Sequence, residues 1–511
     1  MEEAVEICKL RLFLKLVAQV DKTKDLEPLP DVDFNIRAGN TLVGFVSREE
    51  IRLASEKEIS GQGKLVFGQT EKALQRIEEE AEIVDRAYQK FHEMQTEYGM
   101  DACEFSDQKQ VLRENLNTLK GELDQYLARE YGVHPEKSTE FYKWRTSHQP
   151  FHWFAEFYGI MTHEGFNVVI GNPPYVEYGK VKKQYQIMGY QTENCGNLYG
   201  YVLERTFALM QGNGGRIGLI VPISIASSER MLPLRTQTLF FCRNIWLSNF
   251  AIRPQPLFPE IVQRNSIVIG RLSKEATYQL YSSHYLRWTA VERPYLLTRL
   301  SFREVSEILG GNKIVPKVDT QTGIHILKKM NGLSKHIGQL ANGRPGVLYF
   351  HDSGESYWTK TLWEKPVAYR NGDRVEPAQW FSVRIPVDER PFIYLLLNSN
   401  LLYWLWTVFT DCRHMTKGFI ESISLPENRG IDDTLVGKLK AAYSQNTTLF
   451  EKRPGYKSPE IKVQNFKPLI DEIDRALAKH YGFTDEELDF IINYDIKYRM
   501  GTSDSEDENG A

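Results

Sequence analysis

Hydrophobic and polar positions recur along this chain with two different periods, and each period predicts a type of element. In residues 4–18 the apolar positions recur at helical spacing among strong helix formers, which predicts a helix. Residues 33–45 alternate with a period of two and reach a turn at Gly39 and Asn40, which predicts a strand. Residues 1–65 are therefore expected to hold a helix followed by a strand.

Residues 72–130 follow a different pattern. Leu74 and Ile77 begin a series of apolar positions spaced by three and four, and Leu112 begins a second series. Charged residues fill the gaps, which predicts two amphipathic helices packed as an antiparallel hairpin. We expect residues 66–137 to form a structural arm inserted into the core rather than a catalytic part.

Apolar runs of strand length follow the arm, and a helical pattern separates the first two. The runs occupy residues 166–171, 216–224, 245–252 and 265–272, and the helical pattern occupies residues 198–211. Buried strands that alternate with helices are typical of a parallel α/β sheet. The predicted fold class is therefore α/β, with residues 138–275 continuing the core that residues 1–65 begin.

The second half of the chain changes character. Short strands between Gly, Pro and Asn turns predict an α+β region, and the sequence TDEE before an apolar run predicts a capping box near the C-terminus. Trp404 and Trp406 are expected to be core residues. The expected ranges are 276–330 for a helical linker, 331–428 for the α+β region, 429–500 for a helical C-terminal region and 501–511 for a disordered acidic tail.

Composition adds four points to this picture. The chain has 511 residues, 41% of them hydrophobic, and a net charge of −4 that the acidic tail accounts for. The segment 451–467 is locally basic, which fits either a solvated surface or a contact with a polyanion. Five cysteines without close pairs predict no zinc site or disulfide framework and a reducing cytoplasm. No run approaches the length of a membrane span.

The stretch FNVVIGNPPY, residues 166–175, carries the candidate chemistry. A predicted strand runs into Gly171, and Pro173 and Pro174 then fix the backbone while their carbonyl oxygens remain as acceptors. Asn172 adds a side-chain acceptor and Tyr175 adds a flat apolar ring. Ligands of open α/β sheets bind at the carboxyl ends of the strands. The tip therefore suits a planar ligand with an exocyclic amino group.

This stretch resembles the NPPY motif of the amino-group DNA methyltransferases. The sequences NLYGYVLERTFALMQGNGGRIGLIVPIS and LFPEIVQRNSIVIG are similar to the later motifs of the same family, in order. The arrangement resembles the gamma class of N6-adenine enzymes, especially type IIG restriction–modification methylases and their phage-defence relatives. The likeness covers most of the chain, and it implies a partial Rossmann-like sheet followed by a target-recognition domain at 331–428.

The resemblance implies a mechanism. The target adenine is flipped out of double-stranded DNA, and its amino group donates to the Asn172 side chain and the Pro173 carbonyl. The N6 atom then takes the methyl group of S-adenosylmethionine directly, so Cys195 has no expected role. Tyr175 is expected to stack on one face of the base and Phe258 on the other.

The cofactor half of the motif set is missing from the sequence. The family holds its cofactor with a Gly-rich loop after a first strand, and this chain begins at the helix that should follow. Asn40 and Val202 are the remaining candidates for cofactor contacts. Three explanations stay open: a truncated gene, a split enzyme completed by a separate polypeptide that carries the loop, or a retained DNA-binding remnant.

The implied recognition domain supplies the candidate DNA contacts. Arg344, Arg370 and Arg374 are candidates for reading bases, and Lys417 is a candidate for holding phosphate. Two alternatives to a methyltransferase follow from the missing loop and from the arm. The chain could be a catalytically inactive DNA-binding or specificity subunit, or an assembly protein built around the arm.

Overall fold

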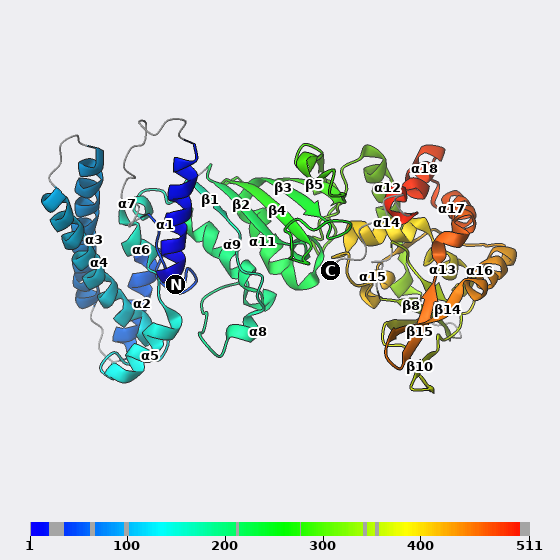
Figure 1. The fold of residues 1–511 in the computed structure, drawn as a ribbon, viewed down its shortest axis with the longest axis horizontal. Helices are drawn as coiled ribbons and strands as arrows, with labels where there is room; N and C mark the ends of the chain where they lie inside the picture. Colours follow the sequence, from blue (N-terminus) through cyan, green and yellow to red (C-terminus); the bar gives the residue numbers. More distant parts are fainter. Residues whose placement is uncertain are drawn as a thin grey trace. The chain divides into compact units, whose positions relative to one another are not determined.

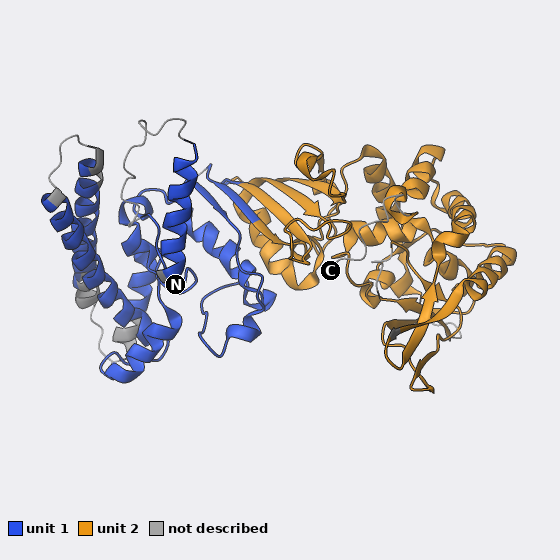
Figure 2. Ribbon diagram, in the orientation of Figure 1, with its two compact units in different colours: residues 1–219, 271–274 blue, residues 220–270, 275–511 orange. Residues whose placement is uncertain are grey.

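The computed structural model describes residues 2–19, 35–61, 67–96, 102–210, 214–275, 277–340, 345–352 and 357–500. The chain divides into two compact units, residues 1–219 with 271–274 and residues 220–270 with 275–511 (Figure 2). The expected acidic tail and the candidate Arg344 lie outside the described residues.

The first unit begins with the predicted helix. This helix is α1 (Glu2–Val17), whose apolar side chains are largely exposed. The other elements of the unit that precede the large sheet are α2 (Arg48–Gly61), α3 (Phe67–Thr96), α4 (Ala102–Glu130), α5 (Ser138–His148), α6 (Trp153–Glu156) and α7 (Tyr158–Met161).

The strand predicted at 33–45 is wrong for the part that the structure describes. Residues 35–45 form turns and a single bridge between Asn40 and Pro150. The Phe151 amide donates to the Val43 carbonyl over 2.7 Å, and a Cβ added to Gly44 would lie 2.1 Å from the Phe151 carbonyl oxygen. The alternating pattern therefore reflects close packing against a distant loop rather than a ladder of strand pairs.

The arm is the predicted helical hairpin. Helices α3 and α4 lie side by side (Figure 1), and an ion pair of Arg76 with Glu122 and a ring contact of Phe91 with Phe105 give them antiparallel directions. Glu156 of α6 pairs with Lys120 of the arm over 2.6 Å. The arm is thus fixed to the rest of its unit by buried charge as well as by apolar contact.

The largest sheet has six strands in the order β1-β2-β4-β3-β5-β6. The pairs β1/β2 and β3/β5 are parallel, whereas β5/β6 is antiparallel, so the sheet is mixed. Helices α8 (Tyr178–Val181), α9 (Leu198–Leu209), α10 (Ser224–Ser227) and α11 (Leu232–Phe241) occur among the strands β1 (Val168–Gly171), β2 (Arg216–Pro222), β3 (Cys242–Phe250), β4 (Asn265–Leu272), β5 (Gln279–Leu286) and β6 (Arg303–Glu304).

The helical linker expected at 276–330 is wrong. Its first part forms β5 and β6, and its only α-helix among the described residues is the start of α12 (Gln321–Asn331). Strand β5 is hard to recognise because Ser282 and Ser283 stand at fully buried positions. Both serines bond to Asn249 of β3, whose side-chain nitrogen donates to the Ser282 hydroxyl over 3.2 Å. Because this buried network places polar residues where a strand pattern has apolar ones, the hydrophobic pattern of the sequence does not reveal β5.

The second unit continues with short strands and helices, as the α+β pattern predicts. Trp404 and Trp406 are each 1% exposed, so their core position is confirmed. The capping box of Thr484 and Glu487 is also present. The elements are β7 (Lys335–His336), β8 (Pro345–His351), β9 (Thr361–Leu362), β10 (Ala368–Arg370), β11 (Asp373–Val375), β12 (Trp380–Pro386), α13 (Arg390–Leu396), α14 (Asn400–Phe409), α15 (Lys417–Glu421), β13 (Ser424–Leu425), α16 (Asp433–Gln445), β14 (Thr447–Arg453), β15 (Tyr456–Ile461), α17 (Lys467–Tyr481), α18 (Asp485–Asn493) and α19 (Ile496–Arg499).

A sheet crosses the boundary expected at residue 428. The order of this four-stranded sheet is β11-β10-β15-β14, and Arg370 of β10 lies opposite Tyr456 of β15. The range 429–500 is therefore not purely helical, because it contributes a hairpin to the strand-rich region. The locally basic segment noted in the sequence forms much of that hairpin.

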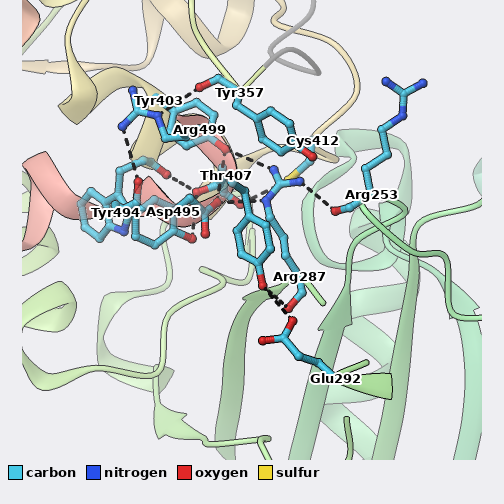
Figure 3. Close-up of polar contacts among 12 residues, drawn as sticks. Arg253, Arg287, Glu292, Tyr357, Tyr403, Thr407, Cys412, Tyr494, Asp495 and Arg499 are labelled. Carbon is cyan, nitrogen blue, oxygen red and sulfur yellow. Dashed lines mark hydrogen bonds and ion pairs between the residues drawn. The ribbon is translucent and has the colours of Figure 1, made fainter. Parts of the chain in front are cut away.

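A buried polar network attaches the C-terminal segment to the end of β5 (Figure 3). The Arg287 guanidinium donates from Nε to Asp495 over 3.0 Å and from Nη2 to the Tyr403 hydroxyl over 3.2 Å. Burial opposes the charge of Arg287, but Tyr403 and Asp495 raise its pKa well above the usual value. Arg499 stacks on Trp358 and Tyr403 and donates to the Tyr357 carbonyl.

A second buried carboxylate, Asp474 of α17, lies against the start of α14. It accepts from the Asn400 and Leu401 amides, yet its burial raises its pKa from 3.8 to about 7. The folded protein therefore holds this proton more tightly than the unfolded chain, so stability is lost as the pH rises toward and through 7. We expect unfolding free energy to fall by about 2 kcal/mol between pH 5.5 and 8.5, and calorimetry on Asp474→Asn should show that contribution removed.

Among the residues that the structure describes, no single helix is long and apolar enough to cross a membrane; α13 and α14 meet the length and composition criteria only as a bent pair.

Candidate active site

The NPPY tip lies directly after β1, as predicted. Strand β1 ends at Gly171, and residues 172–176 have no regular structure. Asn172 is exposed, whereas the next residue, Pro173, is buried in the protein. Gly171 does not adopt a left-handed φ, and a Cβ there would make an ordinary 3.5 Å contact with Leu219. A left-handed glycine turn is therefore not what shapes the tip.

The far side of the tip is fixed by the start of α9. The Leu198 amide donates to the Val176 carbonyl and the Tyr178 amide donates to the Gly196 carbonyl, both over 2.9 Å. Asn197 caps α9 and donates from its side chain to Glu177 over 3.2 Å. Only residues 172–175 thus remain between two anchored ends. Asn197 is not among the residues predicted from the sequence, although an asparagine just before a helical pattern is a recognisable capping signal.

The tip closes on itself in this structure. The Tyr175 hydroxyl donates to the Asn172 side-chain oxygen over 2.6 Å. Partial burial raises the pKa of Tyr175 to about 12, so this hydroxyl keeps its proton at neutral pH. The acceptor expected to hold a ligand amine is therefore occupied by a neighbouring donor, which an incoming amine has to displace.

Tyr175→Phe is expected to release that acceptor while it keeps the aromatic ring. Under the predicted binding of a flipped adenine at the tip, the hydroxyl bond to Asn172 must break before the amine can bind. Its loss should therefore leave the affinity for that base unchanged or raise it several-fold. Fluorescence of 2-aminopurine at the target position measures base extrusion directly. Tyr175→Ala is the contrasting variant, since it also removes the stacking face and should weaken binding. Equal losses in both variants would contradict this account.

Phe258 lies in the loop between β3 and β4, in the other unit, and is half-buried. Its loop is held by arginines that the sequence analysis did not single out. Arg293 donates to the Pro256 and Leu257 carbonyls over 3.0 and 2.7 Å, and Arg287 donates to the Arg253 carbonyl over 3.2 Å. The loop thus has a defined conformation, and its pairing with Tyr175 remains a prediction.

The two cofactor candidates are engaged within the protein. The Asn40 side-chain oxygen accepts from the Leu42 amide over 3.2 Å, and Val202 packs against the apolar cluster that contains Leu42 and Tyr201. Each side chain thus has a partner within the protein, and its contact with a cofactor remains a prediction.

The DNA-contact candidates lie in the second unit. Arg370 and Arg374 are exposed on the β10–β11 hairpin, but Arg374 pairs with Tyr369 and Arg370 pairs with Asp373, which places the two arginines on opposite faces. Lys417 is exposed at the start of α15, 3.3 Å from Glu421. The structure therefore does not bring these cations together on one face.

Comparison with known proteins identifies the first half of the chain. Residues 1–250 match the family described as Eco57I restriction-modification methylase. The first half of the chain is thus similar to a restriction-modification methylase domain. A protein of Methanocaldococcus jannaschii named as a type II restriction enzyme and methyltransferase is 24% identical over 270 residues, which cover 46% of this chain. The match covers 22% of that relative, so this chain spans only a fraction of its length.

Solved structures with partial likeness include two restriction–modification enzymes. The type IIL enzyme MmeI, in complex with DNA, shares 12% identity over 64% of this chain and 56% of its own, with a TM-score of 0.32. The type IIG endonuclease BpuSI shares 11% identity over 64% of this chain and 54% of its own, with a TM-score of 0.26.

Proposed function

We propose that this methylase domain transfers a methyl group to N6 of an adenine flipped out of double-stranded DNA, within a restriction–modification or phage-defence system of the cytoplasm. The observation that supports the proposal is the NPPY tip, held at both ends and presenting the Asn172 amide to solvent. S-adenosylmethionine is the proposed donor, and it would supply an electrophilic methyl group.

The residues of the tip would act by holding the amine. The target amino group would donate to the Asn172 oxygen, in place of the Tyr175 hydroxyl, and to the Pro173 carbonyl. Two acceptors favour a tetrahedral nitrogen with an available lone pair, which is the nucleophilic form. Tyr175 and Phe258 are proposed to stack on the base, and Arg370, Arg374, Arg344 and Lys417 are proposed to contact DNA.

We further propose that a separate polypeptide completes the donor site. Among the strands that the structure describes, β1 lies at the edge of its sheet, and its Val168 and Ile170 side chains are 54% and 78% exposed. Edge strands of parallel sheets are normally covered, and an uncovered apolar edge promotes pairing with another chain. A strand with a Gly-rich loop that pairs with β1 would end beside the NPPY tip, because parallel strands present their carboxyl ends at the same edge.

Transfer of tritium from S-adenosylmethionine to DNA tests the proposal. We expect transfer by this chain together with a polypeptide that supplies the strand and loop, and little or none with either alone. If the complex forms and binds DNA but transfers no methyl group to long duplexes that contain many different sequences, the enzymatic proposal is wrong.

A non-enzymatic DNA-binding or specificity subunit is the alternative. It is favoured by one observation, the engagement of Asn40 and Val202 within the protein. Both would bind DNA with steep salt dependence, so the transferase assay distinguishes them: such a subunit would gain no methyl-transfer activity from the added polypeptide.

A further inference from the structure

A cleft of about 630 Å³ opens between the two sheets of the strand-rich region in the second unit. Its walls come from β8, β10, β12, β14 and β15, all in one unit, and Figure 1 shows β8, β10, β14 and β15 close together. The residues that line it are His351, Arg370, Asn371, Pro377, Ala378, Gln379, Trp380, Arg453, Pro454, Tyr456 and Ser458.

The charge of this cleft has one sign. Arg370 and Arg453 both line it and are both exposed, whereas the lining residues that the structure describes include no carboxylate. Asp352 lies 3.9 Å from His351, and Asp373 stands opposite Arg370 in the β10–β11 ladder, but neither is among the described lining residues. Two guanidinium groups that line one concave site attract an anion.

A buried donor without a partner provides an independent sign of a ligand. Ser458 is 5% exposed, and its hydroxyl makes no hydrogen bond in the structure. Leaving a buried hydroxyl unpaired costs free energy, and such groups usually meet a ligand or water. An oxyanion in the cleft could accept from this hydroxyl and from both arginines, while the rings of Tyr456 and Trp380 form the remaining walls.

We propose that this cleft binds a phosphodiester group of the DNA backbone. The inference rests on the proposed function, because it takes DNA as the source of the phosphate. It gives the basic hairpin β14–β15 a role in binding that lies outside the recognition range expected from the sequence. Arginines that hold phosphate fix the register of the duplex without reading its bases.

The salt dependence of DNA binding tests the cleft. Arg453→Gln and Arg370→Gln should each reduce the slope of log affinity against log salt by about 1, so the loss of affinity between 50 and 200 mM KCl becomes about 3-fold smaller. Arg453→Gln should weaken specific and scrambled duplexes alike. Arg475→Gln removes the same charge from an exposed position on α17 and should leave the slope unchanged.

An unchanged slope in both cleft variants, or a loss restricted to the specific duplex, would overturn the phosphate site. If the wild type binds no DNA, the proposed function fails, and calorimetry with inorganic pyrophosphate then tests the cleft alone. Pyrophosphate binding that disappears in the Arg370→Gln/Arg453→Gln variant would support an anion site, and absence of binding to the wild type would overturn it.

Discussion

Asn172→Ala is expected to lower methyl transfer by about 10²- to 10³-fold, because it removes an oriented acceptor from the reacting amine. The side chain is exposed and its recorded partner is Tyr175, so the fold should be unaffected. The loss should appear in kcat, since the bond to the amine strengthens as the nitrogen becomes tetrahedral. Initial rates of tritium transfer at saturating DNA measure it.

Asn493→Ala is the matched control, because Asn493 is an exposed asparagine of α18 that bonds only locally to Asp489. It should transfer at the wild-type rate. Equal activity of Asn172→Ala and wild type would remove the chemical role from the tip, and a loss of DNA binding without a change in kcat would make Asn172 a binding residue instead.

The second large effect concerns stability. Asp495→Ala should lower the unfolding free energy of the second unit by about 3–5 kcal/mol, because it leaves the Arg287 guanidinium buried without its carboxylate partner (Figure 3). Asp495 also has a φ of 56°, which alanine tolerates less well than aspartate or asparagine. Denaturant unfolding followed by tryptophan fluorescence measures the change.

Two further variants separate charge from geometry. Asp495→Asn keeps an acceptor for Arg287 and Tyr403 and tolerates the same φ, so it should lose less than the alanine variant. Asp489→Ala removes an exposed carboxylate and should stay within about 0.5 kcal/mol of wild type. A neutral effect of Asp495→Ala would show that the network contributes little to holding the C-terminal segment.

The sequence was most informative where local pattern decides structure. The hairpin arm, the capping box of Thr484 and the strand that runs into Asn172 each depend on neighbours within a few residues. The pattern failed where distant contacts decide. Residues 35–45 alternate like a strand but pack against residues 149–154, and β5 carries two serines whose partner, Asn249, lies in another strand.

The candidate site shows the same division. The tip was predicted from its own residues, whereas its supports were not. Asn197 reaches the tip through a bridge from another element, and Arg293 holds the Phe258 loop through backbone carbonyls that no sequence pattern reveals. Arg453 of β14 and Arg370 of β10 line the same cleft because β15 pairs with both of these strands.

Nucleoside analysis of methylated DNA tests the central claim most directly. DNA incubated with S-adenosylmethionine and the completed enzyme is digested, and its nucleosides are separated and weighed by mass spectrometry. Binding of the adenine amine at Asn172 predicts N6-methyladenine as the sole methylated product, formed about 10²- to 10³-fold more slowly with Asn172→Ala. Methyl groups on cytosine, or N6-methyladenine made equally well without the Asn172 amide, would contradict it.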